Sequence, residues 1–190
     1  MAGDLGMTAD EVDTWAREVL DFWFALTTEQ QFAKDPALDT RIRERFGTLR
    51  DRVAETRAQR WRGDPRTLLA AVVVLDQFSR NLFRGQAAAF ATDELAQELT
   101  NAALVRGWDA SLSPEERVFL YMPMMHAEHA EGQATSVRLF EALGTAENAA
   151  FARDHAAVFA RFGRFPSRNA ALGRESTAEE LAYLAEGGGW

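Results

Sequence analysis

DPRTLLAAVVVLDQFSRNLFRG, residues 64–85, decides the expected fold of this 190-residue chain. The Asp64-Pro65 pair is typical of a helix start, because an Asp side chain caps the first turn and Pro is favoured at its first position. The run from Leu68 to Leu75 is apolar nearly all round, which is typical of a helix buried inside a helical protein. That run is far shorter than the roughly 20 residues that span a membrane. We therefore expect a central buried helix and no membrane-spanning segment.

Similar start signals precede other stretches in which apolar residues recur at helical spacing. In a capping box a Ser or Thr is followed three residues later by Glu, and each side chain binds the other's backbone N–H. Such boxes are expected at Thr8, Ser113 and Ser176, and Asp35-Pro36 repeats the Asp-Pro start. Gly107 is expected to end a helix that begins near Thr92.

Strand signals are missing, so we expect an all-α protein with seven to eight helices in antiparallel pairs. A chain of this length is expected to form one domain over residues 1–190. Its ends, residues 1–8 and 187–190, are expected to fray.

The composition excludes several classes of function. A net charge of −8 argues against nonspecific nucleic-acid binding, which needs many Lys and Arg. The lack of Cys excludes disulfides and thiolate chemistry and fits a soluble cytoplasmic protein, and the first residues show no basic stretch leading into an apolar one. Of 21 basic residues only Lys34 is lysine, so nearly every cation is a planar guanidinium suited to bidentate pairing.

Two segments share one pattern: LDQFSRNLFRG (75–85) and FGRFPSRNAALGR (162–174) each place Arg-Asn shortly after a Phe, with a second Arg following. The windows 77–92 and 155–174 contain Arg but neither Asp nor Glu. Guanidinium and amide groups that converge in a cleft bind carboxylates or phosphates. We therefore expect a small anionic ligand, possible turnover of it, and no cofactor. The expected binding residues are Arg80, Asn81, Arg84, Arg164, Arg168 and Asn169, with His126 and Gln133 facing them.

Two alternatives remain open. In the first, the same arginines are structural and tie helix ends and loops to buried acids, as Asp76 and Arg80, four residues apart, would do. In the second, the protein is a helical interaction module whose groove holds a partner peptide by its terminal carboxylate.

The three His residues all fall within 126–155. His126 and His129 are three residues apart, so they are expected to share a helix face that Gln133 extends. Glu128 falls on another face, and the HAEH string lacks zinc-protease spacing, so no metal site is expected. A His near the Arg-Asn segments could act as a general base.

The strings VLDFWF (19–24), LDQFSRNLFRG (75–85), FLYMPMMHAEH (119–129) and FGRFPSRNAALGRESTAEE (162–180) resemble the bacterial domain-of-unknown-function 924 family. The resemblance runs from about Val19 to Leu184. It implies an α-helical, tetratricopeptide-like superhelix and carries no established activity. Ser167 stands where the family's F-P-x-R-N string has His, so a chemical role for that histidine would not transfer to this chain.

Overall fold

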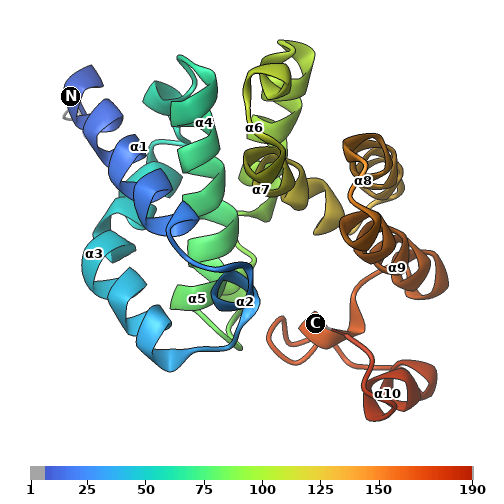
Figure 1. Ribbon diagram of the computed structural model, residues 1–190. Coiled ribbons are helices and arrows are strands. Elements are labelled where there is room, and N and C mark those ends of the chain that lie inside the picture. Colours follow the sequence, from blue (N-terminus) through green and yellow to red (C-terminus); the bar gives the residue numbers. More distant parts are fainter. Residues whose placement is uncertain (1–6, 190) are drawn as a thin grey trace.

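The computed structural model describes residues 7–189, and all regular structure in that part of the chain is helical (Figure 1). The longer helices are α1 (Ala9–Phe24), α3 (Pro36–Glu55), α4 (Pro65–Val72), α6 (Asp93–Val105), α7 (Pro114–Met125), α8 (Ala130–Leu143), α9 (Ala146–Phe162) and α10 (Ala178–Ala185). The shorter ones are α2 (Thr28–Phe32), α5 (Ser79–Leu82) and the turns η1 (Gln59–Trp61), η2 (Val73–Phe78), η3 (Ala87–Ala89), η4 (Trp108–Ser111) and η5 (Pro166–Arg168). The prediction of an all-α fold is confirmed.

Residues 65–82 form one continuous helical run, α4–η2–α5. Asp64 caps it by accepting hydrogen bonds from the backbone N–H groups of Arg66 and Thr67, at 2.9 and 3.1 Å. Side chains from Leu68 to Leu75 are fully buried, as expected for the central helix. The turn η2 is π-helical, which the sequence did not indicate, and such turns are frequent at functional sites.

Aromatic side chains from several helices fill the space around this central run. The Phe78 ring centroid lies 5.7 Å from that of Trp23 and 5.0 Å from that of Phe46. Trp23 also meets Phe119 edge-on at 5.4 Å. Such contacts add about 0.5–1.5 kcal/mol per pair beyond the apolar area they bury, so the core fixes how α1, α3, η2 and α7 pack.

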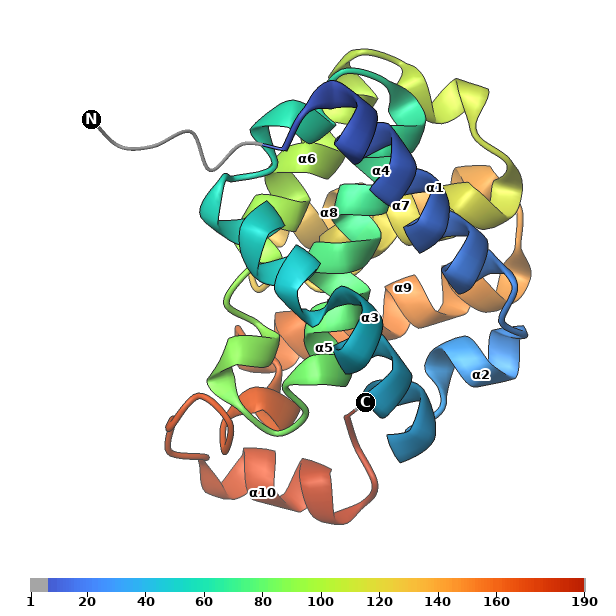
Figure 2. The same cartoon turned by 90° about the vertical axis from the view of Figure 1, so that its left-hand side faces the viewer.

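From α4 through α6, α7, α8 and α9 to α10, the helices follow one another in chain order across the molecule (Figure 1). The central α4 packs against α1, α6 and α7, and then α7, α8 and α9 pack in sequence. Beyond α9, a loop with η5 leads to α10, which lies below α5 in Figure 2. The tetratricopeptide-like arrangement and the single domain over residues 1–190 stay predictions.

Two of the three expected capping boxes form as expected, at Thr8 with Glu11 and at Ser113 with Glu116. The third prediction, at Ser176, is wrong by one residue, because Thr177 and Glu180 form the box instead. Ser176 and Thr177 are each followed three residues later by Glu, so the local pattern does not distinguish the two registers.

Of the ends expected to fray, residues 1–6 and 190 lie outside the described part of the chain. Met7 is buried and Thr8 caps α1, so residues 7 and 8 belong to the packed structure. Over residues 7–189, no helix has both the length and the apolar content needed to cross a membrane.

Candidate functional site

The first Arg-Asn segment holds an aspartate of another helix. Asn81 donates to Oδ1 of Asp39 on α3 at 2.7 Å, and Arg84 donates to both Asp39 oxygens at 2.7 and 2.8 Å. Burial pushes the pKa of Asp39 upward, but the hydrogen bonds from Arg84 and Asn81 outweigh it and lower that pKa below its ordinary value. Asp39 is therefore ionised and neutralises Arg84.

Arg80 and Arg168 bring the two segments together at one carboxylate. Arg80 donates to both oxygens of Asp93 at 2.9 and 3.0 Å, and Arg168 donates to its Oδ2 at 3.1 Å. Both guanidinium groups also lie near the ring of Phe90, with Cζ 5.5 and 4.7 Å from its centroid, within the range of cation–π attraction. We call Arg80, Asp93, Arg168 and Phe90 the junction.

The rest of the second segment is anchored away from the junction, at Glu180. Arg164 donates to both Glu180 oxygens at 2.6 and 2.8 Å. Asn169 donates to Ser176 at 3.0 Å and to Glu180 at 3.3 Å. The hydrogen bonds from Arg164 hold the pKa of Glu180 at about 2. These contacts fix α10 against the loop that follows α9.

A further bidentate pair holds the same loop from its other side. Arg174 donates to both oxygens of Glu128 at 2.8 and 3.0 Å, and the Phe165 backbone N–H donates to Glu128 at 2.6 Å. Burial raises the pKa of Glu128, but Arg174 and that N–H outweigh it and lower the pKa. The loop after α9 is thereby tied to the connection between α7 and α8.

Beside the junction, Asp76 and His126 form a buried acid–imidazole pair. His126 Nδ1 lies 2.7 Å from Oδ1 of Asp76, and Gln77 donates to the other Asp76 oxygen. The expected pair of Asp76 with Arg80 is present at 3.5 Å. Burial pushes the pKa of Asp76 upward, but Arg80 and His126 lower it well below its ordinary value. The ionised Asp76 therefore accepts a hydrogen bond from the Nδ1–H group of His126.

Two neutral imidazoles lie together here. Burial lowers the pKa of His126, although Asp76 opposes the shift, and burial together with His126 lowers the pKa of His155 to about 3. The two ring centroids are 6.2 Å apart, and Arg168 donates to the His126 carbonyl at 3.0 Å. With Nδ1–H directed at Asp76, Nε2 of the neutral His126 is the basic nitrogen, as in general bases held by a carboxylate.

The prediction that His126, His129 and Gln133 share one helix face is wrong. Helix α7 ends at Met125, where Pro123 has already removed one backbone donor, and α8 begins at Ala130. His129 caps α8, because its Nδ1 accepts the Gly132 backbone N–H at 3.0 Å. His126 and His129 therefore lie in the connection between two helices, and of the three residues Gln133 alone lies within a helix.

Gln133 braces that connection. Its amide donates to the carbonyls of Met125 at 2.8 Å and Ala127 at 2.6 Å, on either side of His126. Its Oε1 is buried and has no hydrogen-bond partner among the described residues. Gln133 thus positions the His126 backbone, where the sequence suggested direct contact with a ligand.

Sequence reasoning missed the acids. The partners of the expected binding residues are Asp39, Asp93 and Glu180, with Glu128 holding Arg174. Only the acid-poor windows hinted at them, since arginines without nearby acids must pair over longer distances. In residues 7–189, no group of three or more His, Cys, Asp or Glu side chains is arranged to hold a metal ion.

Comparison with known proteins places the chain in a family. A sequence model described as "Bacterial protein of unknown function (DUF924)" matches residues 19–188. A comparison with curated proteins found no match. A solved structure, of the protein of unknown function ATU0120 from Agrobacterium tumefaciens, is 38% identical, with a TM-score of 0.88 over 92% of this chain and 99% of that one. The chain belongs to the DUF924 family of bacterial proteins.

Proposed function

We propose that the protein binds a small anionic ligand at the junction and that His126 exchanges a proton with that ligand. The observation that carries the proposal is the sharing of Asp93 by Arg80 and Arg168, beside the Asp76–His126 pair. Two guanidinium groups, a carboxylate-held imidazole and an aromatic ring meet there, which are the groups that bind carboxylates and phosphates.

Unused donors support binding at Arg168. A guanidinium group has five N–H donors. Within residues 7–189, Arg168 donates one bond to Asp93 and one to the His126 carbonyl. Its flat faces lie on the rings of Phe90 and Phe165, with Cζ 4.7 and 4.8 Å from their centroids. The group is thus held between two aromatic rings, and these two hydrogen bonds use two of its five donors.

The charge balance at the junction makes the proposed binding depend on pH. Arg80 and Arg168 are matched by Asp76 and Asp93, so the cluster is neutral while His126 is neutral. A bound anion would add uncompensated negative charge, which favours protonation of the nearest basic nitrogen. Binding is therefore expected to take up a proton on His126 and to be stronger at lower pH.

Calorimetry with inorganic phosphate and citrate, in two buffers of different ionisation enthalpy, tests both parts. The His126→Asn variant keeps a donor for Asp76 but does not titrate, so it should bind more weakly and without proton uptake. Arg168→Gln should weaken binding at least tenfold. Arg153→Gln, in an exposed pair with Glu141, is the control and should bind as wild type does.

Failure of phosphate, citrate and a panel of small carboxylates and phosphate monoesters to bind at millimolar concentration would contradict the proposal. A large stability loss in Arg168→Gln together with that failure would favour the structural alternative. For the peptide alternative, the exposed large apolar side chains of the described residues do not favour one groove, because they lie on four different helices: Phe32, Val105, Phe151 and Leu181. That alternative stays a prediction, to be tested by capture of a partner protein.

A further inference from the structure

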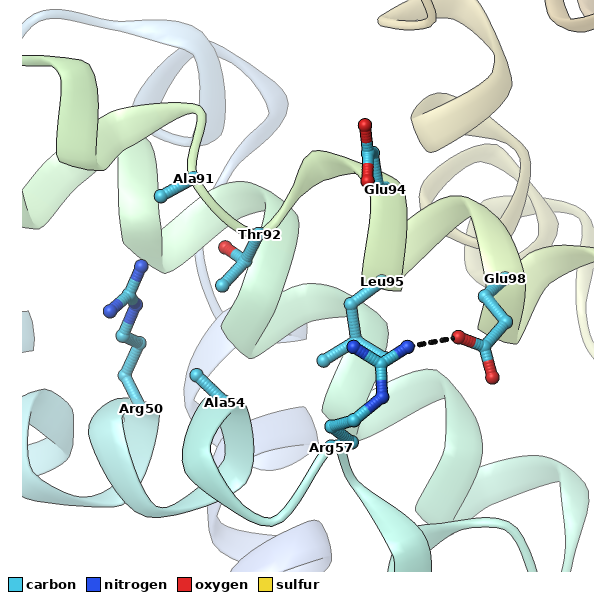
Figure 3. Close-up of a pocket in the computed structure, with 8 residues that line it drawn as sticks. All are labelled: Arg50, Ala54, Arg57, Ala91, Thr92, Glu94, Leu95 and Glu98. Carbon is cyan, nitrogen blue, oxygen red and sulfur yellow. Dashed lines mark hydrogen bonds and ion pairs between the residues drawn. The ribbon is translucent and has the colours of Figure 1, made fainter.

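A pocket of about 530 Å³ opens between α3 and the start of α6 (Figure 3). Its volume lies in the range of small-molecule sites. The lining residues are Arg50, Ala54, Arg57, Ala91, Thr92, Glu94, Leu95 and Glu98. None of them belongs to the Arg-Asn segments, so the pocket is separate from the site proposed above.

Arg50 is a buried cation held from behind by a chain of hydroxyl groups. Its Nε donates to Ser79 Oγ at 3.0 Å, Ser79 and Thr92 hydroxyls lie 3.1 Å apart, and Thr92 donates to the Leu75 carbonyl at 2.7 Å. Because Nε and the Leu75 carbonyl fix the two ends, each hydroxyl in between accepts from one neighbour and donates to the next. The chain orients the guanidinium group so that its terminal nitrogens lie at the pocket.

Those terminal nitrogens have weak partners. The carboxylate that pairs with Arg50 is that of Asp51, at 3.1 Å, and the Asp51 side chain is 58% exposed. The other nitrogen lies 3.4 Å from the Ala88 carbonyl, at the long end of hydrogen-bond distances. Arg80 and Arg168, by contrast, bind buried carboxylates. A ligand carboxylate could therefore replace the outer contacts of Arg50 and leave its inner ones intact.

Arg57 lies at the other end of the pocket, beside Leu95, with Ala54 between the two arginines (Figure 3). It shares Glu98 with Arg62, at 2.6 and 2.7 Å, so this end carries two cations for one carboxylate. Glu94 is directed away from both arginines in the same view.

The backbone at Arg57 is strained. Arg57 and Ala58 both have φ of +50°, and within residues 7–189 they are the non-glycine residues with positive φ. Side chains disfavour this region, and such residues cluster at ligand sites. Here the conformation follows the end of α3 and directs Arg57 toward Glu98 and the pocket.

We propose that this pocket binds a short-chain dicarboxylic acid, with one carboxylate on the outer edge of Arg50 and the other at Arg57. The methylenes between them would lie on Ala54, Ala91 and Leu95. Arg50 lies five residues before the end of α3 at Glu55, about 7.5 Å at 1.5 Å per residue, and Arg57 lies beyond that end, which suits a two-ended ligand better than a single anion.

The test is titration of the full-length protein with the series from malonate to adipate and with butyrate, by calorimetry and by NMR of the Thr92 and Leu95 amides. At least one diacid should bind more than tenfold tighter than butyrate. Arg57→Gln should remove most of that preference, and Ala91→Phe should block the pocket and abolish binding. Arg168→Gln, which lies at the junction, should leave diacid binding unchanged.

Absence of binding by the whole series would overturn the proposal, as would equal affinity for butyrate or unchanged affinity in Ala91→Phe. Loss of diacid binding in Arg168→Gln would assign the ligand to the junction and would also overturn it. Arg50→Gln should weaken diacid binding at least tenfold. Should that variant fail to fold, the exposed sites Arg57 and Ala91 still decide the question.

Discussion

Replacement of Asp93 by Asn tests whether shared ion pairs hold the two halves of the chain together. Asp93 is 7% exposed, and its two oxygens receive three hydrogen bonds from Arg80 and Arg168, at 2.9, 3.0 and 3.1 Å. Asn has nearly the same volume, so the change removes charge without leaving a cavity. Of the two largely buried guanidinium groups, Arg80 would then keep Asp76 at 3.5 Å, and Arg168 would lose its ion pair.

Breaking one buried ion pair costs about 3–5 kcal/mol, because the remaining charge stays desolvated. We expect a loss of that size in the free energy of unfolding of Asp93→Asn. For a chain of this length, each kcal/mol lowers the melting temperature by about 2–4 °C, so the expected drop is about 6–20 °C. Such a loss is a large share of the 5–15 kcal/mol that typically stabilises a folded protein.

Urea unfolding followed by far-UV circular dichroism measures this loss, with constant slope as the check on two-state behaviour. Glu141→Gln is the matched control, since its pair with Arg153 has exposed side chains (51% and 52%) and should contribute at most about 1 kcal/mol. Adding Arg168→Met to Asp93→Asn should recover part of the loss by removing one orphaned cation. A value for Asp93→Asn within about 1 kcal/mol of wild type would refute the reasoning.

Three further experiments test other parts of the structure. Glu180→Gln should destabilise the protein at neutral pH and match wild type near pH 2. The lowered pKa of Glu180 stabilises the folded state above the unfolded pKa of about 4.5, and this contribution is lost as pH falls toward 2. A difference in urea midpoint that does not change with pH would contradict this. The pKa of His155, lowered to about 3, predicts stability that falls from pH 6.5 toward 3, and His155→Asn should flatten that slope; an unchanged slope would count against it. Gly132→Ala should cost about 1–3 kcal/mol, since a Cβ there would lie 2.4 Å from the Ala127 Cβ, whereas Gly47→Ala, with open space inside α3, should stabilise by about 0.5–1 kcal/mol; equal effects in thermal melts would contradict the close approach.

Features decided within a few residues could be predicted from the sequence. The Asp64-Pro65 start, the capping boxes at Thr8 and Ser113, and the buried run after Asp64 depend on local hydrogen bonds and local hydrophobic pattern. The third capping box was predicted one residue too early, because two overlapping patterns match the local sequence equally well. The contact of Glu180 with Arg164, which comes from a loop, is not part of that local pattern.

Features decided by distant contacts could not be predicted. Pro123 predicts a kink or break near this point, but the connection from His126 to His129 also depends on His129 as a cap and on Gln133 holding carbonyls on both sides of His126, and neither residue is a common choice for that role. The π-helical turn η2 likewise has no local sequence signal that we could identify. The convergence of Arg80 with Arg168 followed from the repeated pattern, but the carboxylate that joins them did not.

The charge of the candidate site in the folded structure differs from the charge that the sequence implies. The acid-free windows suggest two uncompensated cationic patches, yet Arg84, Arg164 and Arg174 each meet a carboxylate from elsewhere in the chain. An anion arriving at the junction thus meets a neutral cluster and must bring or induce its own counter-charge, which His126 can supply by taking up a proton. An anion at Arg50 does not need such a counter-charge, because the carboxylate that pairs with Arg50 is that of Asp51, which is exposed. Binding at the junction should therefore become stronger as pH falls, because His126 takes up a proton, and binding at the Arg50 pocket should not.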